Sequence, residues 1–114
     1  MRSKVTHGHT LSAEQAVAEL EKLGLYPVVT DVPATETDFH WHAFDSVFYI
    51  LEGELEVTDH ESGETYRLIA GDRVEARGSN AHREKHNGFR AAFGLSVDPA
   101  TMVFPLERPL PVPA

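Results

Sequence analysis

The sequence contains no cysteine, which excludes disulfides, thiolate metal sites and cysteine nucleophiles. Any transition-metal site must therefore use histidine, carboxylate or water as ligands. Basic residues are scarce as well: 10 lysines and arginines stand against 18 aspartates and glutamates, for a net charge of −8. An acidic chain repels phosphate groups, so we expect neither nucleic acid nor a membrane surface as a partner.

Long apolar runs are also missing. No run approaches the roughly 18 residues of a transmembrane helix, and residues 1–15 lack the apolar core of a signal peptide. A cytoplasmic location is therefore the expectation. The chain has 114 residues, 41% of them hydrophobic, which predicts one globular domain with one core.

One amphipathic helix is predicted at about residues 12–24, inside an N-terminal segment of residues 1–27. Ser12 and Gln15 have the spacing of a capping box, in which each side chain binds the other residue's backbone N–H. Gly24 is placed to end the helix in a left-handed conformation. We expect this helix to cover an edge or an end of the main body.

The two ends of the chain are predicted to lie outside the main body. Residues 1–11 are polar and expected to be mobile, although they contain a His-x-His pair, His7 and His9. Residues 99–114 contain too many prolines for a central strand. We expect this tail to lie extended over a surface, either of its own chain or of a partner.

Residues 28–98 have the pattern of an all-β sandwich or barrel. Short runs of β-formers recur about every ten residues and are separated by glycine-containing turns. One such turn is expected at residues 52–54. The predicted strands are residues 28–30, 39–42, 47–51, 55–58, 65–69, 73–75 and 89–97.

The chemistry of the chain is concentrated in His40 and His42. Residues two apart in a strand point to the same face, so the two imidazoles lie side by side and Trp41 points away. A divalent metal is a common bridge between such imidazoles. A polar rim without a metal remains the alternative for the pair taken alone.

Two motifs in the sequence resemble those of the cupin family. His40, His42 and Gly53 match the first cupin motif, and Gly71 and His82 match the second. The resemblance implies a double-stranded β-helix, also called a jelly roll or cupin barrel. It also implies a metal site with His40, His42 and His82 as ligands, and one divalent transition metal as cofactor. Iron is the metal that the resemblance favours, and nickel, zinc, manganese or copper could occupy the same ligands.

The chain departs from the two cupin motifs at several positions. Ser46 stands where the family has its metal-binding glutamate, and Arg77 stands at the motif proline. Ser79 is at the place of the second motif's glycine, and Gly78 lies one residue early. The first departure favours a three-histidine site without a carboxylate. Asp45 is a possible fourth ligand or a residue that orients an imidazole, but strand parity turns Ser46 inward and Asp45 outward.

Five further residues are candidates for the site. Glu84 and His86 follow His82 at steps of two and would extend the site if a strand continues there, with an exposed charged loop as the alternative. The hydroxyl of Tyr49 could donate a proton. Phe48 and Phe93 are expected either in the core or along the pocket wall.

Three functions remain open at this point. The resemblance favours a non-haem metal dioxygenase acting on a small chelating or anionic substrate. A metal-dependent isomerase, lyase or hydrolase is the second possibility, with Glu84 or His86 as proton acceptor. A small-ligand-binding module without catalysis is the third. Exposed barrel edges and extended termini also predict a homodimer.

Overall fold

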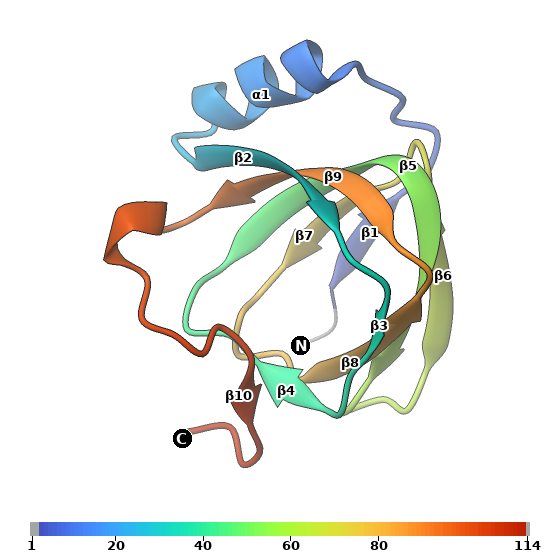
Figure 1. The fold of residues 1–114 in the computed structure, drawn as a ribbon, viewed down its shortest axis with the longest axis vertical. Helices are drawn as coiled ribbons and strands as arrows, with labels where there is room; N and C mark the ends of the chain where they lie inside the picture. The colour runs from blue at the N-terminus through green and yellow to red at the C-terminus, as the bar shows by residue number, and fades with distance from the viewer. Residues whose placement is uncertain (1–2, 114) are drawn as a thin grey trace.

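The computed structural model describes residues 3–113, and antiparallel strands are its main secondary structure. The arrangement is a two-sheet jelly roll with one helix outside it, which confirms the all-β expectation (Figure 1). Among the described residues, no helix has the length and apolar character needed to cross a membrane. In chain order the elements are β1 (Lys4–Thr6), α1 (Ala13–Lys22), β2 (Tyr26–Val32), β3 (Thr35–Glu36), β4 (His40–Trp41), β5 (Ser46–Asp59), β6 (Thr65–Ile69), β7 (Arg73–Ala76), β8 (His82–His86), β9 (Phe89–Leu95), the 3-10 turn η1 (Pro99–Thr101) and β10 (Arg108–Pro109).

The long strand β5 belongs to both sheets. Its first half lies between β7 and β9, and this sheet has the order β1-β7-β5-β9-β2. Its second half lies between β6 and β8 in the other sheet. The far edge of β8 pairs with β3 and β4, and β10 pairs with β4. One strand therefore connects the two walls of the barrel.

The prediction of a turn at residues 52–54 is wrong, because β5 runs without a break through this region. The pairing register with β9 shifts between Ile50 and Glu52, which is a β-bulge. A bulge bends a strand and increases its twist, so β5 passes from one sheet to the other without a turn. Gly53 has φ +84°, and a Cβ there would lie 2.9 Å from the carbonyl oxygen of Gly88.

Helix α1 begins with the capping box that the sequence predicts. The Gln15 N–H donates to Ser12 Oγ at 3.1 Å, and the Ser12 N–H donates to Gln15 Oε1 at 2.9 Å. The helix lies on the outside of the sheet that contains β2 and β9 (Figure 1). Ala16 and Leu20 are fully buried against that sheet, so the helix covers the sheet and leaves the barrel interior free.

The prediction of a mobile N-terminus is wrong for residues 3–11, while residues 1 and 2 lie outside the described part of the chain. Strand β1 pairs with β7 and extends the first sheet. His7 Nδ1 lies 2.7 Å from Asp72 Oδ1, and the His9 N–H donates to the Gly71 carbonyl at 2.6 Å. A three-residue strand is too short to leave a clear sequence pattern, which is why this edge strand was missed.

The proline-rich tail lies on its own barrel. Strand β10 pairs with β4, and the Trp41 Nε1–H donates to the Pro109 carbonyl at 2.9 Å. Figure 1 shows the tail crossing one end of the barrel beside β4. The sequence left open whether the tail lies on its own chain or on a partner. In the structure the tail lies on its own chain.

Candidate metal centre

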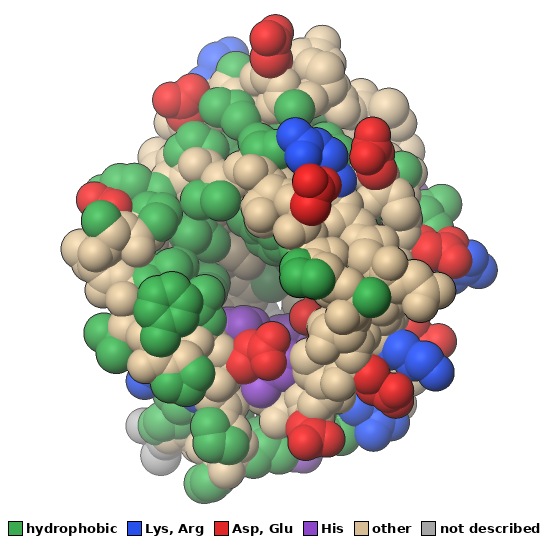
Figure 2. All heavy atoms as spheres, viewed as in Figure 1, with side chains coloured by type: hydrophobic (Ala, Val, Ile, Leu, Met, Phe, Trp, Pro, Cys, Tyr) green, Lys and Arg blue, Asp and Glu red, His purple; other side chains and the backbone are tan. Residues whose placement is uncertain are grey.

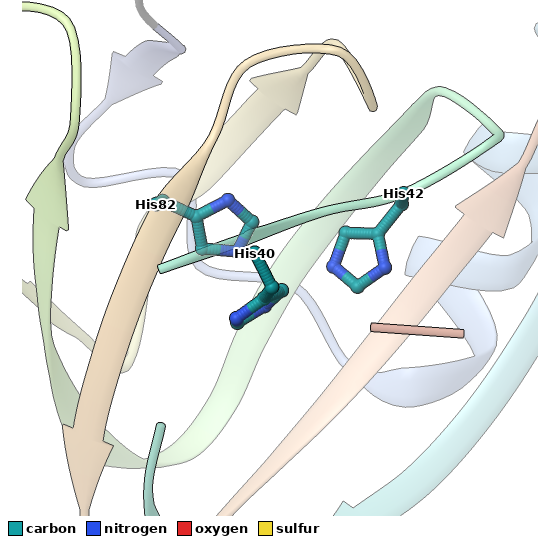
Figure 3. Close-up of side chains that lie close together, drawn as sticks. All are labelled: His40, His42 and His82. Carbon is teal, nitrogen blue, oxygen red and sulfur yellow. The ribbon is translucent and has the colours of Figure 1, made fainter. Parts of the chain in front are cut away.

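The three predicted histidine ligands lie together at one end of the barrel. His40 is on β4, His42 follows that strand directly, and His82 begins β8, where it is the register partner of His40. The ring centroids of His40 and His82 are 4.5 Å apart, those of His40 and His42 are 5.0 Å apart, and those of His42 and His82 are 5.5 Å apart. Figure 3 shows the three rings turned toward a common point.

Backbone carbonyl groups fix the orientation of all three rings. The Nδ1–H groups of His40, His42 and His82 donate to the carbonyl oxygens of Asp38, Leu106 and Asn80, at 2.8, 2.8 and 3.2 Å. A carbonyl can only accept, so each Nδ1 carries the proton and each Nε2 keeps its lone pair. Histidine ligands of metal sites are commonly oriented by such a hydrogen bond.

Burial favours the neutral form of His42 and of His82. Burial lowers the pKa of His42 to about 4, and burial also lowers the pKa of His82, against the opposing effect of its hydrogen bond to Asn80. His40 is only 4% exposed, and its Nε2 has no hydrogen-bond partner. A buried nitrogen without a partner is costly, and coordination of a metal would remove that cost.

The donor set fits a divalent transition metal. One ligand atom of each histidine lies within 4.8 Å of those of the other two. Neutral imidazoles suit zinc, copper, iron and nickel. His40, His42 and His82 are therefore the residues that could hold the ion.

The carboxylate of Asp45 points at the second motif and away from the histidines. Asp45 is exposed, and its Oδ1 accepts the Gly78 N–H at 3.0 Å. Ser46 faces inward and lines the cavity, as the strand parity predicts. The structure thus gives Asp45 a role in holding two loops together, and the fourth-ligand alternative has no support in the geometry.

Gly78, the glycine that lies one residue early in the motif, is packed against the loop that carries His42. Its carbonyl accepts the His42 N–H at 2.8 Å. A Cβ at Gly78 would lie 2.1 Å from the Phe44 carbonyl oxygen and 2.3 Å from that of His42. The neighbouring Ser79 is exposed, so Gly78 supplies the close approach between the two motifs.

A cavity of about 400 Å³ opens beside the histidines, inside the barrel. Figure 2 shows the hollow in the middle of this face, with histidine side chains at its lower edge and an acidic side chain next to them. Phe48 and Phe93 both line the cavity, with ring centroids 5.2 Å apart. Its polar lining includes His42, His82, Ser46, Arg77, Glu84 and Glu107.

Two carboxylates lie next to the histidine cluster. Glu84, on β8, lines the cavity, and burial raises its pKa. Glu107, from the tail, also lines the cavity. One ligand atom of each lies within 4.8 Å of the other and of His40. The structure thus places Glu84 in the site, and the alternative of an exposed charged loop is wrong for it.

Sequence reasoning missed Glu107. A signal for it exists: Glu107 and Arg108 are the only charged residues in residues 99–114, which are otherwise apolar and rich in proline.

Two other catalytic candidates lie outside the cavity wall. His86 is buried beside Phe89, with ring centroids 4.7 Å apart, and its Nδ1 accepts the Gly88 N–H. Tyr49 is buried among the residues under α1, and its hydroxyl accepts from Arg73 Nε at 3.2 Å. Because strand parity turns Tyr49 to the outer face of the sheet, its hydroxyl does not reach the cavity.

A family model described as a cupin domain matches residues 27–97 of the chain. No curated protein matches it. Solved structures with a similar fold include the following three. A DUF861-family protein of Thermotoga maritima has a TM-score of 0.61 at 23% identity, with 82% of this chain and 99% of that chain covered.

The other two structures are more distant in sequence. A protein of Neisseria meningitidis has a TM-score of 0.51 at 18% identity and covers 83% of this chain and 84% of its own. The TDP-quinovose 3,4-ketoisomerase WlaRB of Campylobacter jejuni has a TM-score of 0.54 at 12% identity and covers 74% of this chain and 67% of its own. At these identities the likeness concerns the fold alone.

Proposed function

The chain belongs to the cupin family, and on that basis we propose that it is a small metal-dependent enzyme. In this proposal His40, His42 and His82 hold one divalent transition metal through their Nε2 atoms. The substrate is a small molecule bound in the cavity beside them. A cytoplasmic location is part of the proposal.

The proposal rests on the orientation of the three imidazoles, whose Nδ1–H groups are hydrogen-bonded and whose Nε2 atoms are left for a ligand. Each Nδ1–H is bound to a backbone carbonyl, and one Nε2 is buried without any partner. A buried nitrogen without a partner is costly, and a metal ion bound to it would remove that cost. Three neutral nitrogen donors without a carboxylate leave the full charge of the metal at the site, which favours an anionic chelating substrate.

The chemistry that we favour is that of a non-haem dioxygenase. When bound, iron would supply the activation of dioxygen, and any divalent ion would polarise a chelating oxygen of the substrate. Phe48 and Phe93 would contact the apolar part of the substrate and exclude water from it. The histidines fix the position of the ion, so the chelating end of the substrate would lie next to them.

Metal-dependent isomerisation or elimination is a second candidate, because Glu84 lies in the cavity wall. Its carboxylate is next to His40 and is largely shielded from solvent. A carboxylate in that position could take a proton from a substrate carbon and return it at another. The similarity in fold to a sugar ketoisomerase is compatible with this candidate.

Metal content tests the proposal directly. Untagged protein from medium that holds several metals should contain about one transition-metal ion per chain. His82→Ala should lose the ion, because only two of the three ligands remain. His60→Ala is the matched control, since His60 is exposed and outside the cluster. A wild-type protein without metal would contradict the proposal and favour a binding module without catalysis.

Oxygen consumption separates the two kinds of chemistry. The metal-loaded protein should consume oxygen with small diketones or thiols if it is a dioxygenase. Under the second candidate, turnover needs no oxygen, and Glu84→Ala should abolish it while the metal content stays near one per chain.

A further inference from the structure

The cavity inside the barrel is polar at the histidine end. Ser46 and Arg77 lie beside the loop of His42: Ser46 pairs with the residue before Arg77, and the residue after Arg77 accepts the His42 N–H through its carbonyl. Glu84 lies two residues after His82 on β8. All five residues line the cavity. Figure 2 shows the histidines at the lower edge of the hollow and hydrophobic side chains above and to the left of it.

Farther from the histidines, the first sheet lines the cavity with apolar side chains. Two residues along β5 from Ser46, Phe48 pairs with Val74 on β7 and with Phe93 on β9, and Phe93 pairs with Val28 on β2. Phe48 and these three partners all line the cavity. Two residues of a strand span about 7 Å, so this apolar row lies roughly that far from Ser46.

The second sheet contributes a similar apolar wall. Val57, Leu55 and Leu68 are buried and line the cavity, and Leu55 and Leu68 are register partners on β5 and β6. Thr30 and Tyr66 are the polar side chains among these inner rows. The Thr30 hydroxyl already donates to the carbonyl of the next residue at 3.3 Å. The lining thus changes from polar to apolar with distance from the histidines.

Such a lining selects for an apolar ligand. Packed protein interiors contain few voids larger than a water molecule, and ligand pockets have volumes of about 300–1,000 Å³. The cavity, at about 400 Å³, has room for a small ligand. Each methylene group that moves from water into an apolar cavity tightens binding about 4-fold. A hydroxyl or carboxylate placed there without a partner weakens it.

We propose that the substrate is an amphipathic acid, with a chelating anionic head at the histidines and an apolar body inside the barrel. The body is a short chain or a single ring, and it lies between Phe48 and Phe93 on one side and Val57 and Leu68 on the other. This inference rests on the function proposed above and names the substrate class of the same site. Sugars and dicarboxylates are excluded, because their distal polar groups would face apolar walls.

Hydroxamates test this assignment on the Co²⁺-loaded full-length protein, with the visible absorption of Co²⁺ as the readout of binding. Acetohydroxamate, butanohydroxamate and hexanohydroxamate carry the same chelating head on apolar chains of increasing length. We expect the dissociation constant to fall about 4-fold for each added methylene. Succinic monohydroxamate has a chain similar to that of butanohydroxamate but ends in a carboxylate, and it should bind no more tightly than acetohydroxamate.

A variant with a narrower cavity tests where the apolar chain lies. Val28→Phe places a larger side chain beside Phe93 and should weaken the binding of hexanohydroxamate about 10-fold, because the space for about two methylenes is lost. The affinities for Co²⁺ and acetohydroxamate should stay unchanged, which also shows that the variant is folded. Val103→Phe makes the same change at a residue that is 69% exposed and outside this cavity, and it should leave all affinities unchanged.

The other outcomes separate this inference from the proposed function. If Co²⁺ binds and all the hydroxamates have equal affinities, the metal site stands and the apolar substrate class is wrong. If succinic monohydroxamate binds as tightly as butanohydroxamate, the inner wall accepts charge and the inference is again wrong. If hexanohydroxamate binds Val28→Phe as it binds the wild type, the apolar body does not lie between these walls. If the wild type binds no Co²⁺, the proposed function fails and the inference fails with it.

Discussion

At the scale of single residues, Asp59 connects the end of β5 to the loop that carries His82. Its Oδ1 accepts from Asn80 Nδ2 at 2.9 Å, and its Oδ2 accepts from the N–H and the hydroxyl of Ser62, both at 2.8 Å. The Asn80 carbonyl in turn accepts the His82 Nδ1–H. Asp59 is 1% exposed, and the hydrogen bond that it accepts from Asn80 is buried.

Replacement of Asp59 by asparagine should destabilise the protein by about 1–3 kcal/mol at pH 7, the cost of leaving buried donors without acceptors. Burial raises the pKa of Asp59, but the hydrogen bonds from Ser62 and Asn80 together outweigh it, so the pKa is lowered. The carboxylate therefore contributes stability that is present above the unfolded value of about 3.9 and is lost as the pH falls below it.

Urea unfolding of the wild type and Asp59→Asn at a series of pH values measures this effect. The difference in the free energy of unfolding should be largest near pH 7 and should shrink between about pH 4 and pH 2, as the wild-type carboxylate takes up its proton. A difference that stays constant over this range would show that the charge of Asp59 has no part in it.

The residue scale is also where the sequence was most informative about the site. Motif spacing selected His40, His42 and His82, which the fold brings together, and parity turned Ser46 inward. Glu84 followed from a two-residue step along one strand. Glu107 could not follow from spacing, because it reaches the site through the path of the tail in three dimensions.

At the scale of elements, the two motif loops touch through Gly78. Gly78→Ala would place a methyl group against the carbonyl oxygens of His42 and Phe44, and backbone atoms cannot move aside as a flexible side chain can. We expect a loss of about 1–3 kcal/mol in stability and weaker metal binding, because His42 has to shift. Thermal unfolding and Co²⁺ titration measure the two effects.

Ser79→Ala is the matched control for this prediction, since Ser79 is the exposed neighbour. It should behave like the wild type in both measurements. If Gly78→Ala also behaved like the wild type, the two loops could move apart without cost. The close approach at Gly78 would then not position His42.

Regular elements were predictable where their own residues determine them. The capping box gave the start of α1, and the alternating pattern gave β9. The predictions failed where pairing decides the structure. Residues 52–54 look like a turn, but the neighbours of β5 in both sheets keep it extended, and β1 exists because β7 offers it an edge.

At the scale of the whole molecule, the reason to expect a homodimer changes from the extended tail to two exposed apolar residues. The tail packs on its own barrel, so it gives no reason to expect an exchange of tails. Val103 and Phe104, however, are 69% and 76% exposed and adjacent. Exposed neighbouring apolar side chains of this size favour contact with another protein surface.

Light scattering should therefore give the mass of two chains for the wild type and of one chain for Phe104→Asp. Leu23→Asp is a suitable control, because Leu23 is also exposed but lies at the end of α1. A wild-type mass of one chain would contradict the dimer.

The hydrogen bond between His42 and the Leu106 carbonyl connects the proposed metal site to the tail. If a docked tail strengthens metal binding, thermodynamic linkage requires that bound metal strengthens the docking of the tail by the same factor. The tail would then be a reporter of occupancy: its amide hydrogens would exchange faster in metal-free protein than in loaded protein. A cell that depletes the metal would thereby also loosen one end of the barrel, in a region that proteases reach first.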